Sequence, residues 1–242
     1  MIIHTLSGVM DSNKQQSAKE AVGIHAARLV EDGMQVGLGT GSTTAFAIRE
    51  IGRRIKEEGL RIVGTPTSFA AERLGREMGI PIVSLDVISE LDIALDGADE
   101  VDPALNLIKG RGAAHTREKV VAALASRFVA LVDSSKLVDQ LGILKPVPVE
   151  VLPMAVTPIM HQLEDLGADP VIRMGVNKDG PVVTDQGFWI VDAQFGAIAD
   201  PRALDVTLHA IPGVLDHGLF IDMAETVLVA EEDGSVRTLK KG

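Results

Sequence analysis

The hydrophobic pattern changes repeatedly along the chain, and each pattern predicts a helix or a strand. Short unbroken runs of Val, Ile and Leu alternate with stretches in which apolar residues recur every three or four positions. The unbroken runs are typical of strands buried on both faces, and the longer period is typical of helices with one buried face. We therefore predict helices at 17–30, from the loop after 38 to Gly59, at 68–78 and at 113–125, and strands at 34–38, 61–65, 80–85, 91–95 and 128–132. This alternation indicates an α/β fold in which helices cover both faces of a parallel sheet.

The pattern changes near Lys145. We predict an extended segment at 146–151, a helix at 158–166, antiparallel strands at 171–174 and 182–191, and a helix at 203–211. Strands and helices in this mixed order are typical of a small α+β domain. The segment 225–240 then alternates around the polar turn 232–235, which predicts a hairpin.

Charge and composition exclude several classes of function. The 242 residues include 23 basic and 34 acidic ones, for a net charge of −11, so nucleic-acid backbones would be repelled. An anion must therefore be held by a local site. Cysteine is absent, which excludes disulfides, a thiol nucleophile and thiolate metal ligands. Aromatic residues make up 3% and tyrosine is absent, so a base-stacking surface is not expected.

The N-terminus does not have the pattern of a secretory signal, and no run approaches the roughly 20 apolar residues of a membrane helix. We expect a soluble cytoplasmic protein with no membrane partner, whose first dozen residues form a mobile extension.

A glycine-rich loop, Gly37-Leu38-Gly39-Thr40-Gly41-Ser42-Thr43, joins the first predicted strand to a helix. Backbone N–H groups at a helix N-terminus attract anions, and the loop adds the hydroxyls of Thr40, Ser42 and Thr43. Two known phosphate motifs do not fit, because Ser42 replaces the third glycine of the dinucleotide fingerprint and no lysine is present for a Walker loop. An ordinary tight turn is the alternative interpretation.

An acidic turn follows the strand predicted at 91–95. Asp96, Asp99, Glu100 and Asp102 place four carboxylates where this strand ends, and ligands of open α/β sheets bind outside such ends. Crowded carboxylates push their pKa values apart, which suits proton transfer. The spacing does not fit a calcium-binding hand, since positions six and twelve would be Val101 and Leu107. A solvated surface turn is the alternative.

A third loop, Lys109-Gly110-Arg111-Gly112, precedes the helix that carries Glu118. Its two cations would attract an anion, or stabilise one that forms during a reaction. Glu118 shares a helix face with Val121 and Ala122, so we expect its side chain to point inward. A buried carboxylate needs a function or a partner, and Lys109 is a better partner than the adjacent Arg117 or Lys119.

Together these segments resemble ribose-5-phosphate isomerases of the A type. The resemblance rests on GLGTGST, TSFAAERLG, DGADEVD, KGRGAAHTREKVV, LVDSSKLVDQLG and PVPVEVLP, in family order, and on the later LDVTLHAIPGVLDHGLF. It implies a Rossmann-like domain over 17–143 and 216–242, a smaller ferredoxin-like domain over 144–215, and an N-terminal extension over 1–16. It also implies the interconversion of ribose 5-phosphate and ribulose 5-phosphate without a metal or organic cofactor, by a homodimer or homotetramer.

The resemblance also assigns the site residues. The three substrate-binding loops correspond to Thr40, Gly41, Ser42 and Thr43, to Asp96, Gly97, Ala98 and Asp99, and to Lys109, Gly110, Arg111 and Gly112, with Lys136 as a further ligand near the phosphate. Glu118 matches the general base, Lys109 would stabilise a cis-enediolate, and Asp96 and Asp99 would serve hydroxyl protons and ring opening.

Several points stay open at this stage. Arg111 and His115 depart from the usual family pattern, and we expect a packing role for His115. Asp133 either lines the cleft or caps the next turn. The alternative functions are a related sugar-phosphate deaminase and a non-catalytic sugar-phosphate sensor.

Overall fold

The computed structural model describes residues 3–231 and 233–241, with side chains from Lys14 onward. Its main sheet has six strands in the order β13-β12-β6-β3-β1-β2. Neighbouring strands run parallel except for the edge pair of β12 and β13. The bounds are β1 (Gln35–Leu38), β2 (Val63–Pro66), β3 (Ile93–Gly97), β6 (Phe128–Asp133), β12 (Thr226–Ala230) and β13 (Val236–Lys240). The predicted α/β fold with a parallel sheet is confirmed, and so is the C-terminal hairpin.

Helices cover both faces of this sheet, because side chains of each strand alternate between two cores. One core joins Ile93 and Leu95 to helices α1, α2 and α3. The other core joins the intervening Ala94 to helix α4. The bounds of these helices are α1 (Ile3–Ala27), α2 (Ser42–Glu58), α3 (Phe69–Glu77) and α4 (His115–Leu124).

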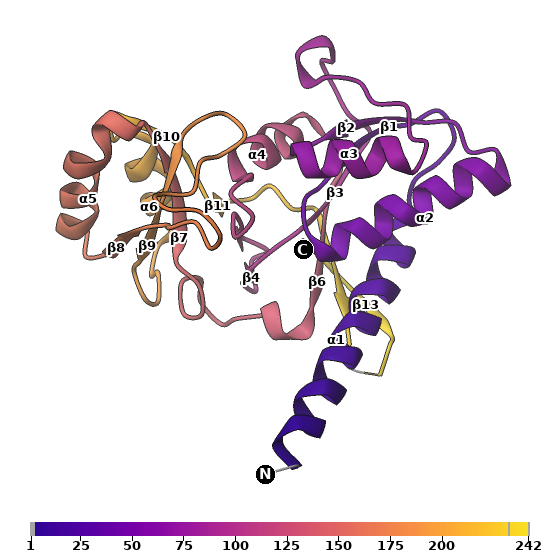
Figure 1. The fold of residues 1–242 in the computed structure, drawn as a ribbon, viewed down its shortest axis with the longest axis horizontal. Coiled ribbons are helices and arrows are strands. Elements are labelled where there is room, and N and C mark those ends of the chain that lie inside the picture. Colours follow the sequence, from indigo (N-terminus) through magenta and orange to yellow (C-terminus); the bar gives the residue numbers. More distant parts are fainter. Residues whose placement is uncertain (1–2, 232, 242) are drawn as a thin grey trace.

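Two helix ends follow from local sequence as expected. The Ser68 side chain accepts the N–H of Ala71 and caps α3, and Gly59 ends α2 in the left-handed conformation, with φ of 75°. The start of α1 differs from the prediction, since the helix begins at Ile3 and not near residue 17. Residues 3–16 contain one glycine and no proline, so nothing in them stops the helix from extending. The expected extension is therefore helical where it is described, and its first turns stand away from the rest of the chain (Figure 1).

Two predicted strands are wrong in extent. Only Ile82 of the segment 80–85 forms a bridge, with Gly64, because Pro81 has no N–H to donate and the chain then turns into η1 (Leu85–Val87). The strand predicted at 182–191 begins at Trp189, since the Thr184 hydroxyl accepts N–H groups from Gln186 and Phe188 and forms a turn.

A second sheet lies at the other end of the molecule (Figure 1). It has the order β10-β7-β9-β8, and all its neighbours are antiparallel. Its elements follow the chain as β7 (Val147–Val151), α5 (Val156–Asp165), β8 (Asp169–Ile172), β9 (Trp189–Gln194), α6 (Pro201–His209) and β10 (Val214–His217). This βαββαβ order is that of a ferredoxin-like domain. We propose the domain division expected from the sequence, noting that β10 runs to His217, past the boundary at 215.

A small third sheet, β11-β5-β4, joins two cores. Its Leu107 and Phe220 pack in the core that includes α4, and its Ile108 and Leu219 pack in the core of the second sheet. Its strands are β4 (Glu100–Val101), β5 (Leu107–Ile108) and β11 (Leu219–Phe220), and none of the three was predicted. They were missed because two-residue strands leave no periodic pattern. Two short turns, η2 (Ser134–Lys136) and η3 (Pro153–Ala155), complete the described elements. Within the described residues, no helix is long and apolar enough to span a membrane.

Candidate active site

The glycine loop and the acidic turn meet at the point where the strand order of the main sheet reverses. From β1 the chain moves to β2 on one side, and from β3 it moves to β6 on the other side. The loops that follow β1 and β3 therefore diverge, and a crevice forms between them. The Gly39 N–H donates to the Leu95 carbonyl, and the Thr40 N–H donates to Asp96 Oδ1 at 3.0 Å. A Cβ atom on Gly39 would lie 2.4 Å from Asp96 Oδ1, so this close approach requires glycine.

A cavity of about 510 Å³ opens at this crevice. The predicted residues that line it are Thr40, Gly41, Ser42, Thr43, Gly97, Ala98, Asp99, Lys109, Gly110, Arg111, Gly112, Glu118 and Lys136. Asp96 is the predicted site residue that does not line it. The cavity is also lined by Lys19, Leu131, Val132 and Asp133. All three predicted loops therefore reach one cavity.

Three buried ionisable side chains form the chemical centre. Lys109 Nζ lies 3.1 Å from Asp96 Oδ2 and 3.1 Å from Glu118 Oε2, and it donates to the Gly97 carbonyl. Each of the three side chains is less than 5% exposed. The Glu118 carboxylate shares the buried face of α4 with Val121 and Ala122, as expected. The predicted pairing of Glu118 with Lys109 is confirmed.

Burial and mutual charge set the protonation of this centre. Burial, followed by the charge of Asp96, raises the pKa of Glu118 to about 8, against the opposing effect of Lys109. Burial also raises the pKa of Asp96, although Lys109 opposes the change. Burial alone would lower the pKa of Lys109, but the two carboxylates outweigh it and the net pKa is raised. Lys109 is therefore a permanent cation beside a carboxyl group that titrates near neutrality.

The third loop is fixed by its glycine and by side chains that bind its backbone. Gly110 has φ of +107°, and a Cβ atom there would lie 2.7 Å from the His115 ring, so glycine is required. The Arg111 N–H donates to Asp99 Oδ2 at 3.0 Å. Arg173, from the small domain, donates to the carbonyls of Gly110 and Arg111. Sequence reasoning missed Arg173, because its loop partners lie about 60 positions earlier in the chain.

His115 is fully buried, and within the described part of the chain neither ring nitrogen has a hydrogen-bond partner. Burial lowers its pKa to about 3, so the ring is neutral and fits the packing role expected for it.

The lining of the cavity also includes groups that suit an anion. Helix α2 begins at Ser42, and its N-terminus opens toward the cavity together with Lys136 of η2 and Lys19 of α1. Lys19 was missed because a single lysine on a helix carries no motif. The Asp133 side chain accepts the Ser135 N–H and also lines the cavity, so both interpretations of Asp133 apply.

Residues 63–234 match the family model of ribose 5-phosphate isomerase A (phosphoriboisomerase A). The chain belongs to the ribose-5-phosphate isomerase A family. It is 55% identical over 223 residues to the ribose-5-phosphate isomerase A of Thermosynechococcus vestitus, covering 92% of this chain and 94% of that relative. It is 49% identical over 233 residues to that of Pyrococcus abyssi, covering 96% and 99%.

Solved structures give the same assignment. The ribose 5-phosphate isomerase A of Methanocaldococcus jannaschii superposes with a TM-score of 0.89 at 48% identity, covering 93% of this chain and 98% of that one. A D-ribose-5-phosphate isomerase in complex with phospho-erythronic acid superposes with a TM-score of 0.90, also at 48% identity, covering 92% and 97%. The ribose-5-phosphate isomerase A resemblance seen in the sequence is therefore confirmed, as is the Rossmann-like fold with its smaller α+β domain.

Proposed function

We propose that the chain interconverts D-ribose 5-phosphate and D-ribulose 5-phosphate through a cis-enediolate. The observation that carries this mechanism is the Lys109 ammonium, which lies within 3.1 Å of both the Asp96 and the Glu118 carboxylates and lines a cavity that Lys19 and Lys136 also line. An aldose–ketose isomerase needs a base near C1 and C2, a positive group near their oxygens, and an anchor for the phosphate. The residues that line this cavity supply all three.

Glu118 is the base in this proposal. In the open-chain aldose, its carboxylate takes the proton from C2, the C–H electron pair forms the C1–C2 double bond, and the carbonyl electrons move to O1. The resulting acid returns the proton to C1 while O2 gives up its proton and becomes the ketone oxygen, and O1 is reprotonated. One carboxylate can serve both carbons in turn, and a pKa of about 8 suits the transfer in both directions.

Lys109 stabilises the enediolate oxygen. Its charge is needed most when the negative charge develops on the oxygen. Because the Lys109 ammonium is buried and already in position, no free energy is spent on reorganisation at that moment. Asp96 and Asp99 transfer protons to and from the sugar hydroxyls and assist the opening of the ring. Of the two, only Asp99 lines the cavity, which favours it for direct contact with the sugar.

The phosphate is held at the α2 end of the cavity. Ser42 and Thr43 offer backbone N–H groups and hydroxyls at the helix N-terminus, and Lys19 and Lys136 add two cations. This arrangement explains how a protein with a net charge of −11 can hold an anionic substrate.

The test is an assay of ribulose 5-phosphate formation by the wild-type chain and by Glu118→Gln. We expect turnover to fall by roughly 10²–10⁴-fold while substrate affinity changes much less. Glu164→Gln is the matched control, because Glu164 is an exposed glutamate on α5. Near-normal turnover in Glu118→Gln would remove Glu118 from the mechanism. A wild-type chain that binds the sugar phosphate without turnover would be a sensor, and release of ammonia from an amino-sugar phosphate would indicate a deaminase.

The homodimer or homotetramer expected from the resemblance belongs to the same proposal. Large apolar side chains that would be more than half exposed in a single chain support it, and they include Val171, Met174, Val176 and Val183 of the small domain. Light scattering at several concentrations tests it. A cytoplasmic location is also proposed, because a phosphorylated sugar does not cross a lipid bilayer unaided.

A further inference from the structure

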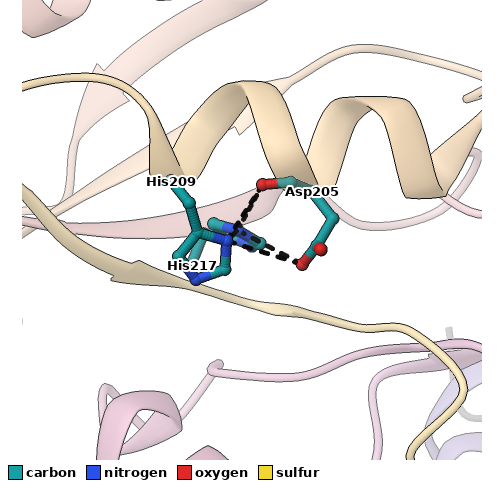
Figure 2. A group of neighbouring side chains, drawn as sticks. All are labelled: Asp205, His209 and His217. Atoms are coloured by element: carbon teal, nitrogen blue, oxygen red, sulfur yellow. Dashed lines mark hydrogen bonds and ion pairs between the residues drawn. The ribbon is translucent and has the colours of Figure 1, made fainter.

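Three potential metal ligands converge in the small domain, outside the cavity already described. Asp205 and His209 lie one turn apart on α6, and His217 ends the adjacent strand β10. Figure 2 shows the Asp205 carboxylate and the two imidazole rings turned toward one another. The His217 side chain is fully buried, whereas Asp205 and His209 are 26% and 45% exposed, so an ion could reach the cluster from solvent.

The distances between the ligand atoms match one face of a coordination tetrahedron. His209 Nδ1 lies 2.9 Å from His217 Nε2, and Asp205 Oδ1 lies 3.7 Å from the first nitrogen and 3.5 Å from the second. Metal–ligand bonds of about 2.0–2.1 Å at tetrahedral angles separate neighbouring ligand atoms by about 3.3 Å. Each separation therefore differs from this value by a few tenths of an ångström.

We propose that Asp205 Oδ1, His209 Nδ1 and His217 Nε2 bind one divalent transition-metal ion, with Zn²⁺ the best fit. Two imidazoles and one carboxylate form a donor set that zinc accepts, and the exposed side of His209 leaves room for water as a fourth ligand. None of the three residues lines the active-site cavity, so the ion would tie α6 to β10 and take no part in isomerisation.

The surroundings of the cluster support binding. The second nitrogen of His209, Nε2, lies 3.3 Å from Asp216 Oδ1, and a metal-bound histidine usually donates its other N–H to such a carboxylate. Asp216 also adds a negative charge next to the ion. Lys119 opposes binding, because its ammonium group donates to Asp216 and to the His217 carbonyl. The carboxylates of Asp205 and Asp216 outnumber the one ammonium group of Lys119, so the net charge around the site is negative and favours a cation.

Without an ion, at least one of the two facing nitrogens carries a proton, which it can donate to the other nitrogen or to the Asp205 carbonyl oxygen, 3.0 Å from His209 Nδ1 and 3.2 Å from His217 Nε2. Metal binding moves this proton to His217 Nδ1, at the expense of a long 3.3 Å contact from the Leu219 N–H, or releases it to solvent. Affinity for the metal should therefore fall as the pH is lowered.

The experiment uses the untagged chain, cleared of metal with a chelator and dialysed. Equilibrium dialysis with Zn²⁺ should give one ion per chain, and Co²⁺ should give the visible absorption of a tetrahedral site. In His209→Gln we expect Zn²⁺ affinity to fall by more than about 10-fold, and in Asp216→Asn by about 10–100-fold. His161→Gln is the matched control, because His161 is exposed on α5 with Asp165 one turn away and has no third ligand among the described residues.

Thermal unfolding with and without Zn²⁺ gives a second readout. The midpoint should rise with Zn²⁺ in the wild type and in His161→Gln, and the rise should be smaller in His209→Gln. Wild-type protein that binds no Zn²⁺, or that gives Co²⁺ no tetrahedral spectrum, would overturn the proposal. Equal binding by wild type and His209→Gln would do the same, and the three side chains would then form a hydrogen-bonded cluster only.

Discussion

The raised pKa of Glu118 predicts how the isomerase activity depends on pH. Only the ionised carboxylate can accept a proton from carbon, so kcat/KM should rise with pH and level off above about 8. At pH 6, about one chain in a hundred would carry the ionised base, and kcat/KM should be about 100-fold below its plateau. A base with an ordinary glutamate pKa would be fully ionised at that pH.

The neighbours of Glu118 determine where this rise occurs. The charge of Asp96 is the largest cause after burial, so Asp96→Asn should move the rise to lower pH. The charge of Asp99 contributes less, so Asp99→Asn should move it less. Asp165→Asn, at an exposed position on α5, is the control and should leave the profile unchanged.

The assay is ribulose 5-phosphate formation at low substrate concentration from pH 5.5 to 9.5, with each variant normalised to its own plateau. The substrate phosphate also titrates near pH 6, but it does so equally in every variant, so the comparison between variants isolates Glu118. A wild-type profile that is flat between pH 6 and 9, or an Asp96→Asn profile that does not move, would refute the reasoning.

The same pKa has a consequence for stability, with a definite sign. Unfolded Glu118 loses its proton near pH 4.5 and native Glu118 near 8, so the native state holds more protons between these values and loses stability as pH rises. The difference of about 3.5 between the two pKa values corresponds to about 5 kcal/mol. Glu118→Gln lacks this penalty, so its stability relative to wild type should grow by up to about 5 kcal/mol from pH 4 to 9. Urea unfolding measures it, and a constant difference would mean that native Glu118 has an ordinary pKa.

Three further predictions follow from the site. Lys109→Ala should cut turnover by on the order of 10²-fold or more, the scale of one lost oxyanion donor, while calorimetric affinity for a sugar phosphate falls far less; equal losses would make Lys109 a binding residue only. Lys136→Ala and Lys19→Ala should raise KM more than they lower kcat in steady-state kinetics, and an unchanged KM would place the phosphate elsewhere. Dialysis against a strong chelator should leave turnover at ambient temperature intact, because none of the proposed catalytic groups needs a metal; activity restored only by a divalent ion would contradict this.

Local sequence determined most of the elements and the chemistry of the loops. The apolar runs at β1, β3 and β6 and the period of α2 and α4 are properties of neighbouring residues, and so are the caps at Ser68 and Gly59. The inward face of Glu118 also followed from spacing alone, because helix geometry fixes which residues share a face. The prediction at 80–85 was wrong because one proline removed the hydrogen bond that a ladder needs.

Tertiary structure decided which of these groups meet. After β3 the chain folds back through the antiparallel pair of β4 and β5, and this brings Lys109 to Asp96 at the end of β3. The same folding brings Lys19 from the first helix to the cavity, and it carries His217 to Asp205 and His209 on α6. No period or motif encodes such meetings, because strand order is set by packing across the whole sheet, whereas sequence patterns report only on residues a few positions apart.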